Sequence, residues 1–224
     1  MFGMLPRPDR PVAPPPPGAA SARPGRRALL LAVAGLAPAV PAALAARAPL
    51  RFRILREGAE IGTHLVTFAG TAGAPTALTE VDITVRLAGF TVFRMRHSFR
   101  ESWAEGRLRE AASRLDRNGR VSEMAARAEG DAILVEGTAG ARRLPREAAP
   151  LTWWETRRFG GPLFDNATGR PLRLHWTRTP AAGGMVRWRC TGDTEAEGLY
   201  AADGTWLSWA TRGDDGSAVT YERA

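Results

Sequence analysis

Apolar and polar residues alternate with a period of two along most of the chain from Leu50 onward. In residues 78–87, for example, every charged side chain falls on an even position, and the odd positions carry Thr79 and then aliphatic residues. This alternation is typical of β-strands that bury one face. It predicts strands over residues 50–55, 61–68, 78–87, 91–103, 107–116, 120–128, 132–136, 172–178, 185–191, 195–200, 206–211 and 218–222.

Short turn sequences separate these segments. Asn118-Gly119 is the strongest of them, because this dipeptide accepts the positive φ angles of a two-residue hairpin. No segment shows the strand–helix–strand spacing of a parallel sheet, so consecutive strands should pair. We therefore predict an all-β fold, an antiparallel meander of about ten strands curled into a barrel or half-barrel, with one short helix.

Residues 139–171 break the alternation with four prolines and several glycines, which exclude long regular elements. Thr152 has the character of a helix N-cap, and Glu155 follows at capping-box spacing. We expect a short helix over residues 153–159, lying in or over the mouth of the curled sheet.

Residues 1–48 have the pattern of a targeting segment. Arg26-Arg27 precedes an uncharged run that ends in the A-x-A site Ala43-Leu44-Ala45. The arginine pair favours twin-arginine export, with the general secretory route as the alternative. We predict a disordered n-region plus a cleaved export signal over 1–48, a single β-barrel-like domain over 49–224, and a periplasmic or secreted location.

Charge and cysteine content narrow the function classes. The formal net charge is +8, and the 31 basic residues are all arginine. Residues 1–45 carry about half of that excess, and the rest is not gathered into a basic run, which argues against nucleic-acid binding. Cys190 is the single cysteine, so no internal disulfide can form, and its alternation with Val186 and Trp188 predicts a buried, inert thiol.

Several motifs together resemble the exported bacterial family called domain of unknown function 6134. They are Gly58-Ala59-Glu60-Ile61-Gly62-Thr63-His64, Phe93-Arg94-Met95-Arg96-His97, Glu101-Ser102-Trp103-Ala104-Glu105-Gly106-Arg107-Leu108, Arg117-Asn118-Gly119 and Leu163-Phe164-Asp165-Asn166. The resemblance spans most of residues 49–224. It implies a secreted or periplasmic β domain of unassigned activity. More distantly, the chain is similar to other exported β-barrels and to lipoprotein-localisation half-barrels, a likeness of fold that says little about function.

The candidate site residues lie on predicted inward faces. In residues 91–103 the odd positions include His97, Glu101 and Trp103, whereas the even positions include Arg94, Arg96, Ser98 and Arg100. His64 also falls on an apolar face. These groups could line a cavity, bind a metal or act in acid–base chemistry, although strand residues four apart are separated by about 13 Å. Trp153 and Trp154 could stack on a sugar or cover a lipid tail at the cavity mouth, or simply pack the helix.

We expect a noncatalytic β-barrel that binds an apolar or amphiphilic ligand, with His64, His97, Glu101, Trp103, Trp153 and Trp154 as lining residues. We predict no catalytic residues, no metal and no cofactor, because no nucleophile motif, phosphate loop or spaced metal box is present. The expected partner is a lipid-like or other apolar small molecule, with no nucleic acid and no stable membrane span after cleavage. The alternatives are a structural or protein-interaction component of the envelope without a cavity, and an enzyme built on His64, His97 and Glu101.

The signal prediction can be checked on the exported protein. Cleavage is expected close to Ala45 or Ala48, and replacing Arg26 and Arg27 together by Lys should abolish export by the twin-arginine route. N-terminal sequencing of the exported protein reports the cleavage site. A mature protein that still starts at Met1 would contradict the predicted location, and intact export of the double variant would assign the general secretory route.

Overall fold

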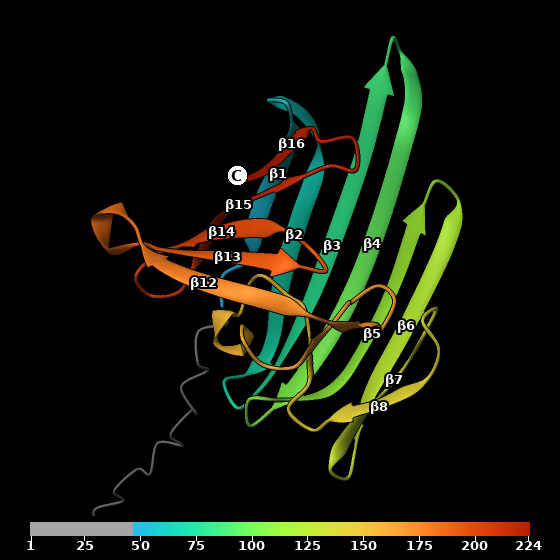
Figure 1. Ribbon diagram of the computed structural model, residues 1–224, viewed down its shortest axis with the longest axis vertical. Coiled ribbons are helices and arrows are strands. Elements are labelled where there is room, and N and C mark those ends of the chain that lie inside the picture. The colour runs from blue at the N-terminus through green and yellow to red at the C-terminus, as the bar shows by residue number, and fades with distance from the viewer. Residues whose placement is uncertain (1–46) are drawn as a thin grey trace, which may run out of the picture. The chain divides into compact units, whose positions relative to one another are not determined.

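The computed structural model describes residues 47–224, which form one large sheet and a short segment that covers it (Figure 1). The predicted n-region and export signal lie almost entirely outside these residues. The strands are β1 (Leu50–Arg56), β2 (Ala59–Thr71), β3 (Ala74–Leu87), β4 (Phe90–Ala104), β5 (Arg107–Arg117), β6 (Arg120–Glu129), β7 (Ala132–Gly137), β8 (Arg142–Pro145), β9 (Ala149–Pro150), β10 (Leu163–Phe164), β11 (Pro171–Leu172), β12 (Leu174–Pro180), β13 (Val186–Gly192), β14 (Ala196–Tyr200), β15 (Trp206–Arg212) and β16 (Ala218–Arg223).

The large sheet contains thirteen strands in the order β12-β13-β14-β15-β16-β1-β2-β3-β4-β5-β6-β7-β8. Two meanders, β1–β8 and β12–β16, are joined where β16 pairs antiparallel with β1. Strands β12 and β8 remain edges, so the sheet does not close. Strands β12–β14 cross the direction of β3–β6, which shows how strongly the sheet curls (Figure 1). The predicted all-β antiparallel meander is confirmed, and of the two predicted forms the structure has the half-barrel.

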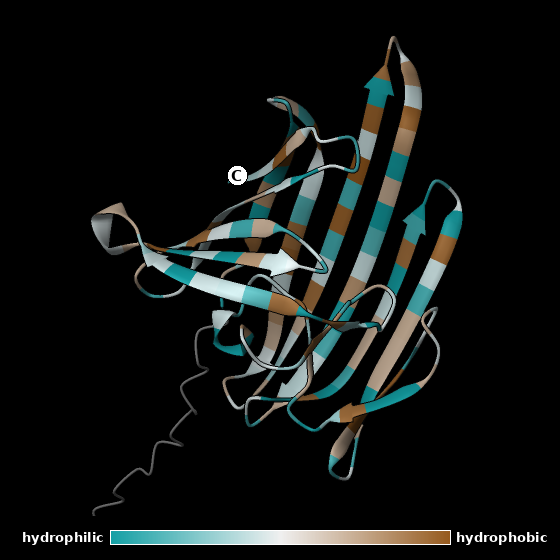
Figure 2. Ribbon diagram, viewed as in Figure 1, coloured by the Kyte–Doolittle hydropathy of each residue, from teal (hydrophilic) through white to brown (hydrophobic). Residues whose placement is uncertain are grey.

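Burial follows the alternation of the sequence. Bands of hydrophobic and hydrophilic residues alternate along β3 and β4 (Figure 2). On β4 the concave-face positions Phe99, Glu101 and Trp103 are buried, while Arg100 between them is exposed. The register of β4 shifts between Ser102 and Trp103 without moving Trp103 to the outside. Cys190 is likewise fully buried, and His175 is exposed.

Residues 146–170, here called the covering segment, pack against the concave face. The segment contains β9, β10 and a single 3-10 turn, η1 (Thr156–Arg158). Together with β11, which follows the segment, β9 and β10 form a small sheet in the order β11-β10-β9. The predicted helix over 153–159 is therefore wrong in length and cap. Glu155 caps the turn through Arg157 N at 3.3 Å, and Thr152 is buried instead. A second 3-10 turn, η2 (Ala182–Gly184), joins β12 to β13.

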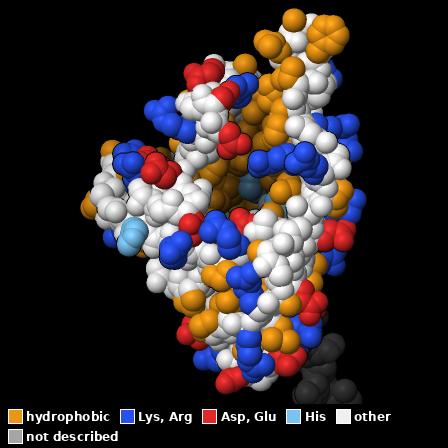
Figure 3. Space-filling model, turned by 45° about the vertical axis from the view of Figure 1, so that its right-hand side comes forward, with side chains coloured by type: hydrophobic (Ala, Val, Ile, Leu, Met, Phe, Trp, Pro, Cys, Tyr) orange, Lys and Arg blue, Asp and Glu red, His pale blue; other side chains and the backbone are white. Residues whose placement is uncertain are grey.

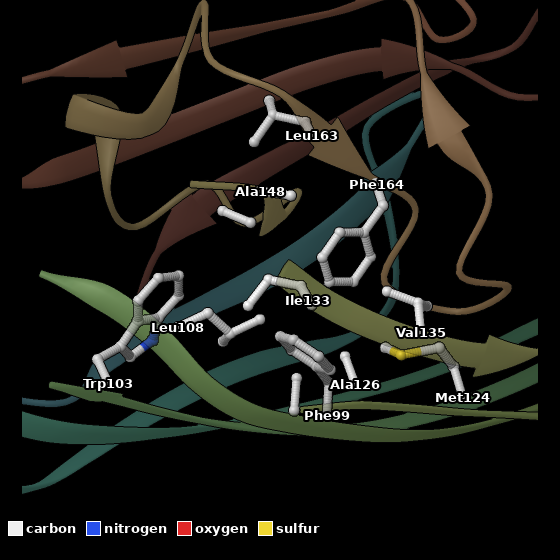
Figure 4. Packing of buried hydrophobic residues seen from close by; sticks show 12 residues of the cluster. Phe99, Trp103, Leu108, Met124, Ala126, Ile133, Val135, Ala148, Leu163 and Phe164 are labelled. Atoms are coloured by element: carbon white, nitrogen blue, oxygen red, sulfur yellow. The ribbon is translucent and has the colours of Figure 1, made fainter. Parts of the chain in front are cut away.

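The covering segment closes a hydrophobic core with β4–β7. Ala148, Leu163 and Phe164 from the segment face sheet residues that include Phe99, Leu108 and Ile133 (Figure 4). Full burial of such side chains contributes about 1.5–3 kcal/mol each to folding. A second buried cluster lies under β1–β3 and β14–β16, and consists of Leu50, Phe52, Ile54, Val66, Ala77, Val81, Ile83, Trp154, Tyr200, Trp206 and Tyr221. The packing of Trp154 in this second cluster anchors the covering segment at both halves of the sheet.

The turn at Asn118-Gly119 has the geometry that the sequence predicts. Asn118 has φ 52° and Gly119 has φ 81°, and the Gly119 amide donates to Asp116 Oδ1 at 2.8 Å. No atom outside the turn lies within 4 Å of the position that a Cβ at Gly119 would take. A side chain there would be penalised by the backbone conformation alone.

Replacing Gly119 by Val should lower the free energy of unfolding by about 1–2 kcal/mol, because positive φ is unfavourable for a β-branched residue. The measurement is the denaturation midpoint in urea. Ala112→Val is the matched control, since Ala112 is an exposed position inside β5 and tolerates β-branched residues. Equal midpoints for the two variants would contradict this description of the turn.

Candidate functional site

All six predicted lining residues belong to the concave face or to the covering segment. Glu101 is fully buried, Trp103 is 2% exposed and Trp154 5% exposed. His64 is 9% exposed, and His97 and Trp153 are half-buried. The inward direction that the alternation predicts is therefore correct for the residues on β2 and β4. Their role in lining a ligand stays a prediction.

Glu101 forms the polar contact between the middle of the sheet and the covering segment. Trp154 Nε1 donates to Glu101 Oε1 at 2.7 Å, while Glu101 Oε2 has no hydrogen-bond partner in residues 47–224. Burial raises the pKa of Glu101 from 4.5 to about 8, against the opposing effects of the Trp154 hydrogen bond and the Arg158 charge. The side chain is thus mainly a neutral carboxylic acid at pH 7.

Arg158 brings a largely buried cation close to this carboxyl. Its guanidinium lies 3.3 Å from the centroid of the Trp103 ring, and Arg158 Nη1 is 3.9 Å from Glu155 Oε2. Burial lowers the pKa of Arg158, and the charges of Glu155 and Glu101 oppose that effect. A cation over an indole face gains electrostatic attraction where water is excluded. Trp103 therefore acts as a packing platform for Arg158.

His64 lies beside a small inner cavity of about 110 Å³ between the sheet and the covering segment. Trp206 and Tyr221 meet its ring edge-on at centroid distances of 5.3 and 5.4 Å. Neither ring nitrogen has a hydrogen-bond partner within the described chain. Burial lowers the pKa of His64 to about 3, with a smaller effect of His97 in the same direction. His64 is neutral at physiological pH.

His97 is in the same cross-strand row as His64, with Val81 of β3 between them. Two strand spacings separate such residues by about 9.5 Å. No hydrogen bond joins His64, His97 or Glu101 to another member of this trio. Within residues 47–224 no group of three His, Cys, Asp or Glu side chains could hold a metal ion. The three groups do not converge on one reacting centre in this structure.

A groove, here called the rim groove, opens where the concave face extends beyond the covering segment. Its volume is about 500 Å³. It corresponds to a hollow with hydrophobic side chains in its depth (Figure 3). Its apolar wall consists of Ile61, Ile83, Val85, Val92, Phe93, Met95, Trp209, Val219 and Tyr221. The six predicted lining residues are not part of this wall. Two of them pack against the wall from behind: the His64 ring meets Tyr221 edge-on at 5.4 Å, and the Trp153 ring meets Trp209 edge-on at 5.5 Å.

Charged residues form the edge of the rim groove. Arg56 pairs with Asp215, and Arg117 Nη1 lies 3.8 Å from Asp214 Oδ2. Arg212 donates to the Gly216 carbonyl at 3.0 Å. The groove therefore combines an apolar floor with an edge of guanidinium and carboxylate groups. This arrangement suits a ligand that has an apolar body and a polar end.

The rim groove is not among the sites predicted from the sequence, because its wall is made of apolar residues that an inward-facing pattern does not separate from ordinary core. Phe93 and Met95 belong to the same odd series of β4 as His97, so alternation alone marks them as inward. Trp209 and Tyr221 face each other across the β15–β16 pair, with ring centroids 4.7 Å apart. The pairing of β16 with β1, two strands that are distant in the sequence, brings the C-terminal strands to a wall opposite β3 and β4.

Replacing Glu101 by Gln should remove a pH dependence of stability. A carboxyl whose pKa is raised on folding costs no stability below its unfolded value of 4.5 and an increasing amount up to about 8. The free energy of unfolding of the wild type should therefore fall relative to the variant by about 3 kcal/mol between pH 5 and pH 8. Gln retains the carbonyl that accepts from Trp154. Urea unfolding at several pH values measures the difference, and parallel curves would show a solvated carboxyl.

One of two similar solved structures supports the architecture. The chain is similar to a β-barrel-like protein of domain of unknown function DUF1849 from Brucella abortus, at 10% identity over 79% of this chain and 94% of that chain, with TM-score 0.53. A DUF1089 family protein from Pseudomonas aeruginosa matches at 15% identity over 63% of this chain and 86% of that chain, with TM-score 0.39. The first likeness concerns the fold alone.

No curated protein sequence matches this one significantly. No helix within the described residues has the length and apolar character needed to cross a bilayer. The sequence profile of the family described as domain of unknown function (DUF6134) matches residues 52–224. This range includes every strand of the sheet except the first two residues of β1, and the chain belongs to the DUF6134 family.

Proposed function

We propose that this protein is a noncatalytic binding protein for an apolar or amphiphilic small molecule, which occupies the rim groove. The observation that carries the proposal is that the covering segment fills only part of the concave face. At the rim the wall of Ile83, Phe93, Trp209 and Tyr221 is left open to solvent through a groove of about 500 Å³. Pockets that bind small ligands have this size and are mainly apolar with a few polar groups.

The chemistry of the groove favours an amphiphile over a polar metabolite. Each methylene that moves from water into an apolar wall contributes about 0.8 kcal/mol, so a chain of several carbons gains substantial affinity without any polar contact. Arg56, Arg117 and Arg212 lie at the edge of the groove, where an anionic headgroup could exchange with the present partners Asp214 and Asp215. A neutral headgroup would leave those ion pairs intact.

An exported location is part of the proposal and rests on the N-terminal sequence. Arg26-Arg27, the uncharged run and the A-x-A site together support it. Outside the cytoplasm, water-insoluble molecules need carriers to move between membranes or to reach a cell surface. An open half-barrel with an apolar groove is suited to that task because the ligand can enter sideways without the sheet unfolding.

Filling the groove should abolish binding. Val85→Trp places a large side chain on the groove wall, and Thr84→Trp places the same side chain on the opposite face of the same strand. With cis-parinaric acid, a fluorescent fatty acid, as the probe, we expect Val85→Trp to raise the Kd at least about tenfold, and Thr84→Trp to leave it unchanged. Fluorescence titration of the lipid-free proteins gives both values.

Native mass spectrometry of the protein purified from its own host without denaturation adds an independent test. A retained amphiphile that is lost in Val85→Trp and kept in Thr84→Trp supports the proposal. Equal parinaric acid affinity for all three proteins, with no retained molecule, would refute it and favour a structural or protein-interaction role. A retained ligand that survives Val85→Trp would move the binding site to the inner cavity near His64.

A further inference from the structure

The hairpin of β3 and β4 stands free of the rest of the sheet at its tip. Pairing of β3 with β2 ends at Ile83, opposite Gly62, and pairing of β4 with β5 begins at Met95, opposite Arg117. Residues 84–94 therefore form strand pairs only across this hairpin. In the ribbon this tip extends beyond its neighbours at the end of the molecule where β4 starts (Figure 1).

The tip of this hairpin is apolar and exposed. Leu87 is 69% exposed, Phe90 76% and Val92 54%, and hydrophobic side chains are visible there in the space-filling view (Figure 3). Leu87 and Phe90 are paired across the strands next to the two-residue turn Ala88-Gly89. Large apolar side chains gathered on one exposed projection indicate an interaction site.

The turn itself differs from the three other turns of the meander in which a left-handed non-glycine residue precedes a glycine. Glu57-Gly58, Glu105-Gly106 and Asn118-Gly119 all have a polar residue first, in the same left-handed conformation. The β3–β4 turn has Ala88 at that position, with φ 49°. Polar side chains suit this turn position, and alanine does not provide one. The whole tip, from Leu87 to Phe90, therefore has no polar side chain.

Unpaired arginines lie on the strands next to the apolar tip. Arg86, Arg94 and Arg120 are exposed, and none of them forms an ion pair with another residue of the described chain. No acidic residue occurs from Ile83 to Arg100. The β6–β7 turn at the opposite rim differs, because Arg143 there is paired with Glu129 and Asp131. An apolar tip with unpaired arginines behind it is complementary to an interface that is anionic outside and apolar inside.

We propose that the β3–β4 tip docks on the surface of an anionic lipid bilayer, with Leu87 and Phe90 inserted at the headgroup level and Arg86, Arg94 and Arg120 on lipid phosphates. Apolar side chains and basic residues act together in this way at membrane surfaces. Val92 belongs both to the exposed tip and to the rim groove, so docking brings the groove mouth to the lipid. The docking itself does not require the proposed function. Only its purpose, the exchange of ligand with the bilayer, rests on that function.

Co-sedimentation of lipid-free protein with vesicles tests the docking. With equal parts phosphatidylglycerol and phosphatidylcholine, the wild type should bind, and Leu87→Ser with Phe90→Ser should weaken the partition constant at least about tenfold. Replacing Arg86, Arg94 and Arg120 by Gln should weaken it by about fivefold per residue and remove most of its salt dependence. The matched control replaces Arg100, Arg107 and Arg109 by Gln, three exposed arginines elsewhere that also lack an ion pair in the described chain, and should bind as the wild type.

A fluorescent label locates the contact. Ala88→Cys and Glu105→Cys place a thiol at the same position of equivalent turns on opposite rims, with φ 49° and 51°, and Cys190 is fully buried. With nitrobenzoxadiazole attached, only the label at position 88 should brighten and shift to shorter wavelength on adding the anionic vesicles. A response at 105 alone, or at neither position, would overturn the proposal.

The proposals of ligand binding in the rim groove and of membrane docking by the tip can be refuted independently of each other. Leu87 and Phe90 do not line the rim groove, so their double variant should keep its affinity for cis-parinaric acid, and Val85→Trp should keep its affinity for vesicles. Equal vesicle binding by the wild type and the Leu87/Phe90 variant would refute docking and leave the groove untouched. A wild-type dimer that this variant converts to a monomer, without vesicle binding, would assign the tip to self-association and also refute it.

Discussion

The structure depends on how an open sheet covers its own concave face. Thirteen strands that curl without closing leave an apolar surface that water would otherwise reach. The covering segment shields part of this apolar surface from water, since Leu163 and Phe164 pack on β4–β7 and Trp154 packs against β1–β3. The aromatic residues of β12–β15 cover a further part, and the Phe159 and Trp176 rings stack there at 3.9 Å. The rim groove, whose wall includes Trp209 of β15, is the part of the concave face that the covering segment leaves open, because β3 and β4 extend beyond the segment.

The polar groups of the interior fix where the covering segment lies. Most of its contacts with the sheet are apolar and non-directional, and such contacts alone would allow the segment to slide. The bonds from Trp154 to Glu101, from Tyr200 Oη to the Trp153 carbonyl and from Arg47 to the Trp154 carbonyl are directional and converge on two adjacent residues. Burial keeps the Glu101 carboxyl protonated at pH 7, and its Oε1 atom accepts the hydrogen bond from the Trp154 indole. Glu101 and Trp154 therefore position the covering segment on the sheet. The sequence pattern predicts the same two residues as lining a ligand cavity.

Local pattern explains which parts could be predicted from the sequence. Alternation gave the strands and the inward direction of Phe99, Glu101 and Trp103, because that direction depends only on the period of two within one strand. The Asn118-Gly119 turn followed from the conformational freedom of two residues. The cap of η1 could not be predicted in this way. Thr152 matches the local pattern of an N-cap but is buried by tertiary packing, and the carboxylate of Glu155 accepts a hydrogen bond from Arg157. The rim groove was also beyond local pattern, since Trp209 reaches it only through the β16–β1 pairing that joins the two ends of the domain.

The β3–β4 tip is the place where this chain departs from the rules that it follows elsewhere. Its strands have two free edges, its turn holds an alanine at positive φ, and its side chains expose Leu87 and Phe90 to water. Free edges invite association with other chains, and alanine in the left-handed region costs about 1–2 kcal/mol. None of these features adds to the buried core, because the core residues of β3 and β4 begin only at Ile83 and Phe99. Since three unfavourable features coincide within residues 84–94 beside an open apolar groove, their cost is best explained by contact with something outside the chain.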